Sequence, residues 1–292
     1  MLSLDSLNLL YRQSGARLAV YLPDSDLITP LSIPDVLAGK CIYCRDATDG
    51  TERPDHPALQ ALGTRRMPLP CGAVCDACND YVKELDRHVC NHNHIATMIL
   101  SAGIIGSKGR IRRSLHEDQV FSYDLRTRTV TIRPNRRVSV ERQGSRLAFS
   151  DPGPGLGNFD PWKFSRGLHR IALGVLAMSS GCDVALEERF DGVRNYIRRP
   201  KGRHEMWRYY QRPTDRLRNN GAVARAVAEG WYYFSFDLER TPALAYLNLI
   251  VDEFVVALTG SLDTVSPADV TSFVESHRIS EDRRSTRPWK LL

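Results

Sequence analysis

The sequence lacks any long, uninterrupted hydrophobic run. Its most apolar late segment, residues 245–259, contains Asp252 and Glu253 and so cannot span a lipid bilayer. The N-terminus carries Asp5 and has no basic start followed by a clean apolar stretch, which argues against a secretory signal. Seven cysteines in 292 residues are too few and too clustered for a secreted disulfide scaffold. We therefore expect a cytoplasmic protein that does not contact membranes.

Internal repeats and low-complexity tracts are also absent. The glycine- and proline-rich stretch at residues 151–162 has no flanking strand and helix, so it favours a linker over a dinucleotide-binding loop. A hydrophobic content of 42% and a charged content of 25% are ordinary for a soluble globular protein. The formal net charge of +6 mildly favours a polyanionic partner.

Three regions differ in their pattern. Residues 1–40 mix short apolar runs with prolines and predict an N-terminal helical segment. Residues 41–115 contain most of the cysteines and form the expected functional module. Residues 116–292 alternate apolar and polar positions over 119–149, read as strands again over 231–259, and show helical spacing between these segments. The sequence therefore predicts an α+β fold, whose C-terminal region would bind DNA or a partner protein.

The module contains two Cys-x-x-Cys pairs, made of Cys41, Cys44, Cys75 and Cys78. Each pair can present two thiolates to one ion, and four thiolates at about 2.3 Å satisfy tetrahedral Zn²⁺. We therefore expect a structural zinc ion. The alternatives are buried free thiols with accidental spacing and, less favoured, a redox-active pair.

Three further cysteines, Cys71, Cys90 and Cys182, lie outside the two pairs. Cys90 could hold a second ion together with His92 and His94. The simpler interpretation of this stretch is the polar end of a helix that begins near Asn79.

A second pattern lies between and after the cysteine pairs. It consists of Asp55-His56, an Ala-Leu-Gly turn at residues 61–63 and a Val-Cys-x-x-Cys-Asn sequence at residues 74–79. Together these residues resemble the HNH endonuclease family, in the branch whose module is held by two zinc knuckles. The likeness covers most of residues 41–200. It implies a zinc-braced ββα-metal (HNH) module followed by a mixed helix and antiparallel-strand C-terminal region.

The resemblance implies a metal-dependent DNA endonuclease. His56 would be the general base that activates a water, because a neutral imidazole with a pKa of about 6.5 can take a proton at neutral pH. Asp55 and Asn79 would ligate a catalytic Mg²⁺ or Mn²⁺ ion, for which carboxylate and amide oxygens are suitable hard ligands. The relatives further imply a nickase in bacterial restriction or anti-phage defence, with protein partners in a defence complex. RNA cleavage would use the same chemistry.

Two departures from the family pattern support a different class of function. Leu59 stands where a proline is usual, and no asparagine lies between His56 and Asn79 to orient the base. A backbone carbonyl could orient the imidazole instead. The alternative interpretation is a catalytically inactive, zinc-containing protein that binds nucleic acid or scaffolds a complex.

Basic residues follow the module. Downstream of Gly106, four of them alternate with apolar or small residues and predict contacts with nucleic-acid phosphates: Lys108, Arg110, Arg112 and Arg113. The alternative is a solvated face that needs no partner.

Overall fold

The computed structural model describes the chain in separate segments. These are residues 39–57, 68–92, 95, 160–198, 205–214, 232–249, 251–276 and 288–292, together with the strands given below between residues 6 and 30 and between residues 114 and 150. They include the four paired cysteines and the Asp55-His56 dipeptide. Outside the described residues lie the Ala-Leu-Gly turn and several predicted positions: Leu59, His94, Lys108, Arg110, Arg112 and Arg113.

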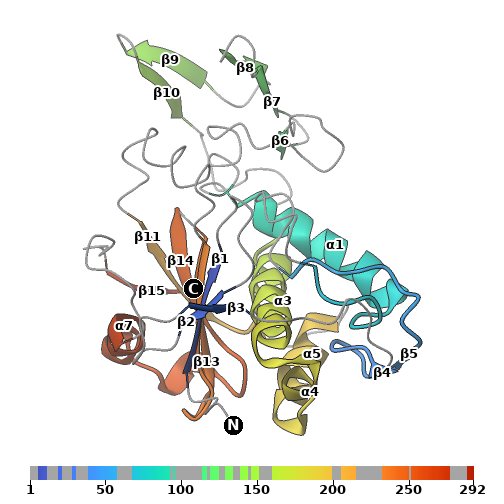
Figure 1. Ribbon diagram of the computed structural model, residues 1–292. Coiled ribbons are helices and arrows are strands. Elements are labelled where there is room, and N and C mark those ends of the chain that lie inside the picture. The colour runs from blue at the N-terminus through green and yellow to red at the C-terminus, as the bar shows by residue number, and fades with distance from the viewer. Residues whose placement is uncertain are drawn as a thin grey trace.

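The described elements are helices and antiparallel strands. The helices are α1 (Asp76–Cys90), α3 (Pro161–Ser180), α4 (Cys182–Ala185), α5 (Asp191–Arg198) and α7 (Pro267–Ser276), with 3₁₀ turns at Glu188–Phe190 and Leu262–Thr264. The main sheet has the order β15-β11-β14-β13-β12-β1-β2-β3 (Figure 1). This mixture confirms the predicted α+β class.

The strands of the main sheet, in that order, are Lys290–Leu291, Tyr209–Pro213, Asp252–Ala257, Leu244–Asn248, Tyr232–Asp237, Ser6–Tyr11, Ala19–Tyr21 and Ile28–Pro30. Three smaller sheets are β4–β5 (Gly39–Lys40, Ala47–Thr48), β6–β8 (Ser114–His116, Gln119–Asp124, Thr129–Arg133) and β9–β10 (Ser139–Gln143, Arg146–Ser150). The strands predicted over residues 119–149 and 231–259 are thus confirmed.

The molecule is layered around α3. This helix covers one face of the main sheet, α1 packs on the side of α3 that faces away from the sheet, and α7 covers the other face (Figure 1). Phe234 and Phe236 point into the core shared with α3, whereas Val255 and Ala257 point into the core shared with α7. Successive side chains of a strand point to opposite faces, so the central strands are buried on both sides.

Local chemistry sets the ends of α3. The Asp160 carboxylate accepts hydrogen bonds from the backbone N–H groups of Trp162 and Lys163, and Pro161 opens the helix, as N-terminal positions favour. Gly181 follows the last turn with φ 102°, a left-handed value that glycine adopts without strain. Every side chain from Phe164 to Ser179 is buried, because α3 lies between α1 and the sheet.

The helical segment predicted for residues 1–40 is wrong in the part that the structure describes. Strand β1 pairs with β12 from Ser6↔Asp237 to Tyr11↔Tyr232, and β2 and β3 extend the sheet beyond it. Pairing with distant strands decides the conformation here, which a local pattern of short apolar runs cannot indicate. Among the described helices, none combines the length and the apolar character needed to cross a lipid bilayer.

Gly167 allows α3 and α1 to approach closely. A Cβ atom at this position would lie 2.4 Å from Cγ2 of Val89 and 3.2 Å from the carbonyl oxygen of Leu85. We expect Gly167→Ala to lower the free energy of unfolding by about 1–3 kcal/mol in a urea titration, because overpacking forces the helices apart. In the control Gly192→Ala, the new Cβ would meet the Trp207 ring at 3.4 Å, an ordinary contact. Equal effects of the two substitutions would contradict the close helix packing.

Candidate metal centre

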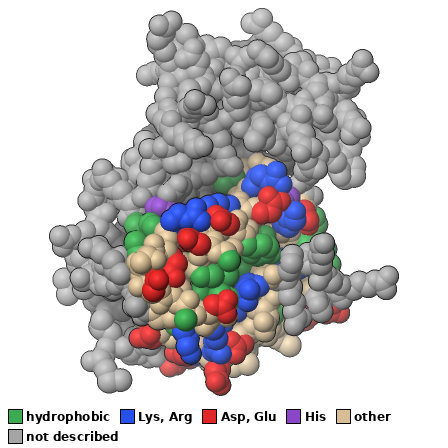
Figure 2. Space-filling view, turned by 90° about the vertical axis from the view of Figure 1, so that its right-hand side faces the viewer, with side chains coloured by type: hydrophobic (Ala, Val, Ile, Leu, Met, Phe, Trp, Pro, Cys, Tyr) green, Lys and Arg blue, Asp and Glu red, His purple; other side chains and the backbone are tan. Residues whose placement is uncertain are grey.

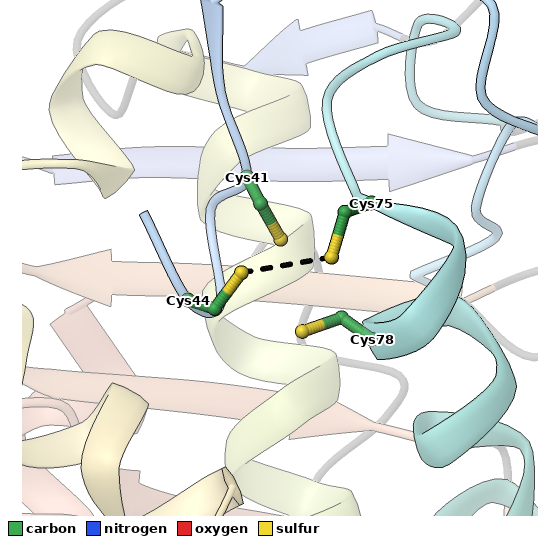
Figure 3. Close-up of side chains that lie close together, drawn as sticks. All are labelled: Cys41, Cys44, Cys75 and Cys78. Atoms are coloured by element: carbon green, nitrogen blue, oxygen red, sulfur yellow. Dashed lines mark hydrogen bonds between the residues drawn. The ribbon is translucent and has the colours of Figure 1, made fainter. Parts of the chain in front are cut away.

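Four cysteine side chains converge between the loop after β4 and the start of α1 (Figure 3). Their sulfur atoms all lie within 4.8 Å of one another, and Sγ of Cys44 is 3.6 Å from Sγ of Cys75. In a tetrahedral site with Zn–S bonds of about 2.3 Å, the sulfurs are about 3.8 Å apart, so the cluster fits one Zn²⁺ ion. The prediction that the two cysteine pairs meet at one potential metal site is confirmed.

The first cysteine pair lies in a tight turn. The N–H of Arg45 donates to the carbonyl of Cys41 at 2.8 Å. Arg45 has φ 64°, in the left-handed region where residues other than glycine are uncommon. Its guanidinium compensates by donating to the carbonyl of Leu186 at 2.7 Å and to Asp191 at 3.1 Å. The turn is thereby tied to the α4–α5 region.

The second pair lies at the N-terminus of α1. Cys75 immediately precedes the helix, and Cys78 belongs to its first turn, where the N–H of Asn79 donates to the carbonyl of Cys75 at 2.9 Å. The N-terminal end of a helix favours negative charge, so this position suits thiolate ligands.

The environment of the four thiols opposes their joint ionisation when no cation is bound. The hydrogen bond with Cys78 lowers the pKa of Cys41 to about 5. The same contact raises the pKa of Cys78, and burial raises the pKa of Cys44. One negative charge is therefore favoured in the cluster and further ones are opposed. A divalent cation would allow the four sulfurs to be ionised together.

Asp55 lies in the same module and is engaged by other side chains. Its Oδ1 accepts a hydrogen bond from Nη2 of Arg170 at 2.6 Å, and its Oδ2 accepts one from the Tyr43 hydroxyl at 3.3 Å. The side chains of Arg170 and Asp55 are 1% and 3% exposed, so this is a buried ion pair. Burial alone would lower the pKa of Arg170, but Asp55 and Asp86 outweigh it and hold that pKa above its ordinary value.

His56 and Asn79 lie at the edges of this arrangement. His56 is half-buried, and burial lowers the pKa of its imidazole below the ordinary value. Its Nδ1 has no hydrogen-bond partner within the part of the chain that the structure describes, so the carbonyl expected to orient the ring is not found there. The side chain of Asn79 donates through Nδ2 to the carbonyl of Arg53 at 3.1 Å.

The structure therefore brings the three predicted catalytic residues into one module, but not into an open site for a hard cation. Magnesium keeps several waters and binds carboxylate oxygens that are free to reach it. Both oxygens of Asp55 accept hydrogen bonds, and the side chain is almost fully buried. As arranged, Asp55 is not available as a ligand for a Mg²⁺ or Mn²⁺ ion.

No second group of metal-binding side chains occurs among the described residues. Cys90 and His92 join no such group, and His94 is outside the described part. Instead, His92 stacks on Phe164 with ring centroids 4.7 Å apart, and its Nδ1 lies 3.4 Å from Asp252. These packing contacts agree with the interpretation of this stretch as the polar end of a helix.

Sequence reasoning missed Arg170 and Tyr43, which contact Asp55, and Gly174, which lies against Pro57 and Tyr43. The available signal was a basic residue inside an apolar helical stretch, since a buried guanidinium requires acidic or carbonyl partners. The sequence could have indicated that Arg170 has such partners, but not that Asp55 is one of them.

The geometry predicts about one tightly held Zn²⁺ per chain by elemental analysis. We expect Cys75→Ser to lose the ion and to unfold residues 41–90, because zinc binding supplies about 10–16 kcal/mol in small zinc modules. Circular dichroism and zinc content measure both effects. Cys71→Ser is the matched control, since Cys71 lies outside the four-sulfur cluster. Retention of zinc by the Cys75 variant would contradict the assignment.

Comparison with known proteins adds no family to this picture. No family model matches the chain, and neither a curated protein nor a solved structure matches it. The four-cysteine cluster and the contacts around Asp55, His56 and Asn79 are therefore the observations from which a function is proposed.

Proposed function

We propose that this protein is an HNH-type endonuclease that hydrolyses phosphodiester bonds in DNA. The observation that supports this most is a contact, beside the four-cysteine cluster, between the segment that carries Asp55-His56 and the Val-Cys-x-x-Cys-Asn sequence. Asn79, in the first turn of α1, donates its side-chain N–H to the carbonyl of Arg53. This bond holds the helix that carries the second cysteine pair against the segment that carries His56.

The chemistry assigned to the chain itself is proton transfer by His56. A neutral imidazole takes a proton from a water molecule as the water oxygen forms a bond to phosphorus. The bond from phosphorus to the leaving deoxyribose oxygen breaks, and that oxygen takes a proton from solvent water, while His56 returns its own proton to solvent. The Mg²⁺ or Mn²⁺ ion that the HNH resemblance implies would, when bound, neutralise charge on the phosphate. Asn79 offers such an ion an amide oxygen, whereas Asp55 is committed to Arg170.

Contacts with DNA are proposed for the basic residues that follow the module: Lys108, Arg110, Arg112 and Arg113. On the face that carries α1 and the β4–β5 hairpin, basic and acidic side chains are interspersed (Figure 2). Arg53 pairs with Asp76 and Asp80 there, and Arg87 pairs with Glu84. Because these cations are already paired, that face is a poor site for phosphate. The proposed setting remains bacterial restriction or anti-phage defence.

A second candidate function is favoured by the ion pair between Asp55 and Arg170. A carboxylate that is 3% exposed and bound to a guanidinium is unavailable to a catalytic cation. The corresponding proposal is a catalytically inactive, zinc-containing protein that binds nucleic acid or scaffolds a complex.

A plasmid assay separates the two candidates. The zinc-loaded protein is incubated with supercoiled DNA and Mg²⁺ or Mn²⁺, with EDTA as a control. We expect the wild type to produce nicked circles, and His56→Ala to be slower by about a hundredfold or more, because it loses general-base catalysis. The variant must keep its zinc and its melting temperature.

Asn79→Ala is expected to reduce nicking as well, since it releases the segment that carries His56. The matched control is Asn91→Ala at the opposite end of α1, where the asparagine follows the last turn. Wild-type protein that binds DNA but leaves it intact under every condition would favour the second candidate. Equal nicking by wild type and His56→Ala would reject the assignment of the base.

A further inference from the structure

A single buried guanidinium contacts three consecutive residues of the candidate catalytic segment. Nη1 of Arg170 donates to the carbonyl oxygen of His56 at 3.0 Å and to that of Pro57 at 2.8 Å. Nη2 donates to Oδ1 of Asp55 at 2.6 Å. These are charge-assisted hydrogen bonds to fixed positions, made from α3, which is far from this segment in the sequence.

Gly174 allows the same segment to lie directly on α3. It stands four residues after Arg170 and therefore on the same face of the helix. A Cβ atom on Gly174 would lie 2.6 Å from Cβ of Pro57 and 2.9 Å from the Tyr43 hydroxyl. Arg170 and Gly174 together form the surface of α3 that contacts residues 55–57. We call this surface the α3 seat.

The backbone of His56 contacts this seat through Arg170. The buried Nδ1 of His56 has no hydrogen-bond partner among the described residues, so no hydrogen bond found there fixes that side of the imidazole. Its backbone, in contrast, is held by Arg170 at the carbonyl and by the neighbouring contacts of Asp55 and Pro57. Residues 53–56 belong to no helix or strand. Besides Arg170, the N–H of Leu69 donates to the carbonyl of Asp55 at 2.7 Å, and Asn79 donates to the carbonyl of Arg53.

We propose that Arg170 is the positioning residue of His56, acting from α3 in place of the asparagine that the chain lacks between His56 and Asn79. The role rests on the proposed function, because it assumes that His56 is the base. Arg170 is 1% exposed and does not reach substrate. Asp55 is then the counter-ion that keeps the guanidinium in place, with Asp86 at 3.3 Å as a second acidic neighbour.

Two substitutions test the seat by different means. Arg170→Lys keeps a positive charge but loses the planar fork that reaches two carbonyls and a carboxylate. Gly174→Ala keeps Arg170 and displaces Pro57. In both, we expect kcat for plasmid nicking to fall about a hundredfold, because a misplacement of about 1 Å can cost that much. KM should stay within about twofold, since neither residue touches DNA.

Gly167→Ala is the matched control. It is the same substitution on the same helix, but its new Cβ meets Val89 of α1 rather than residues 55–57. We expect it to lower the melting temperature while leaving kcat unchanged. A merely structural role for Arg170 predicts instead that kcat follows melting temperature equally in all three variants.

A measurement that does not depend on activity completes the test. In a ¹H–¹³C spectrum of histidine-labelled protein, His56→Ala identifies the ring signal of His56. We expect that signal to shift or broaden in Arg170→Lys and Gly174→Ala but not in Gly167→Ala. If the wild type nicks and the two seat variants keep both kcat and the signal, the positioning role is wrong and the proposed function stands. If the wild type is inert, the proposed function fails. In that case the His56 signal alone tests the seat: a signal unchanged in Arg170→Lys and Gly174→Ala would reject the seat, and a shifted or broadened signal would support it.

Discussion

The convergence of four cysteine sulfurs within 4.8 Å is the constraint on which the N-terminal module depends. The surrounding elements are small: β4 and β5 contribute two residues each. Such a module cannot hold its shape through backbone pairing alone. A cation shared by both cysteine pairs would link the loop after β4 to the first turn of α1 and close the loop of chain between them. Asp55 and His56 lie within that loop of chain.

The buried helix α3 connects the module to the main sheet. One side of it packs against α1, where Gly167 permits close approach, and another side packs against the strands. A buried cation is unfavourable unless acceptors surround it, and Arg170 finds them in residues 55–57. The same contacts that make burial of Arg170 tolerable therefore also place the candidate catalytic segment. Stability and site geometry are coupled through one side chain.

Local features of the fold could be predicted from the sequence, and features made by distant partners could not. The Cys-x-x-Cys spacing alone predicts that the two cysteine pairs meet, because each pair can supply two of the four thiolates that one tetrahedral Zn²⁺ ion binds. The limits of α3 follow from Asp160 and Gly181, which act on adjacent backbone groups. Strand β1 was expected to be helical, since its conformation depends on pairing with β12 near the other end of the chain. The partnership of Asp55 with Arg170 is a long-range contact of the same kind.

That ion pair shows why a motif does not by itself assign a ligand. A carboxylate beside a histidine can ligate a hard cation or pair with a guanidinium, and either positive partner stabilises the ionised carboxylate. Here the guanidinium lies 2.6 Å away and is buried with it, so Asp55 is neutralised inside the protein. Arg170 cannot extend that neutralisation to a phosphate, because its side chain is 1% exposed. In the proposed endonuclease, positive charge acting on the phosphate would therefore come from groups other than this pair, and placing the base would be separate from neutralising the phosphate.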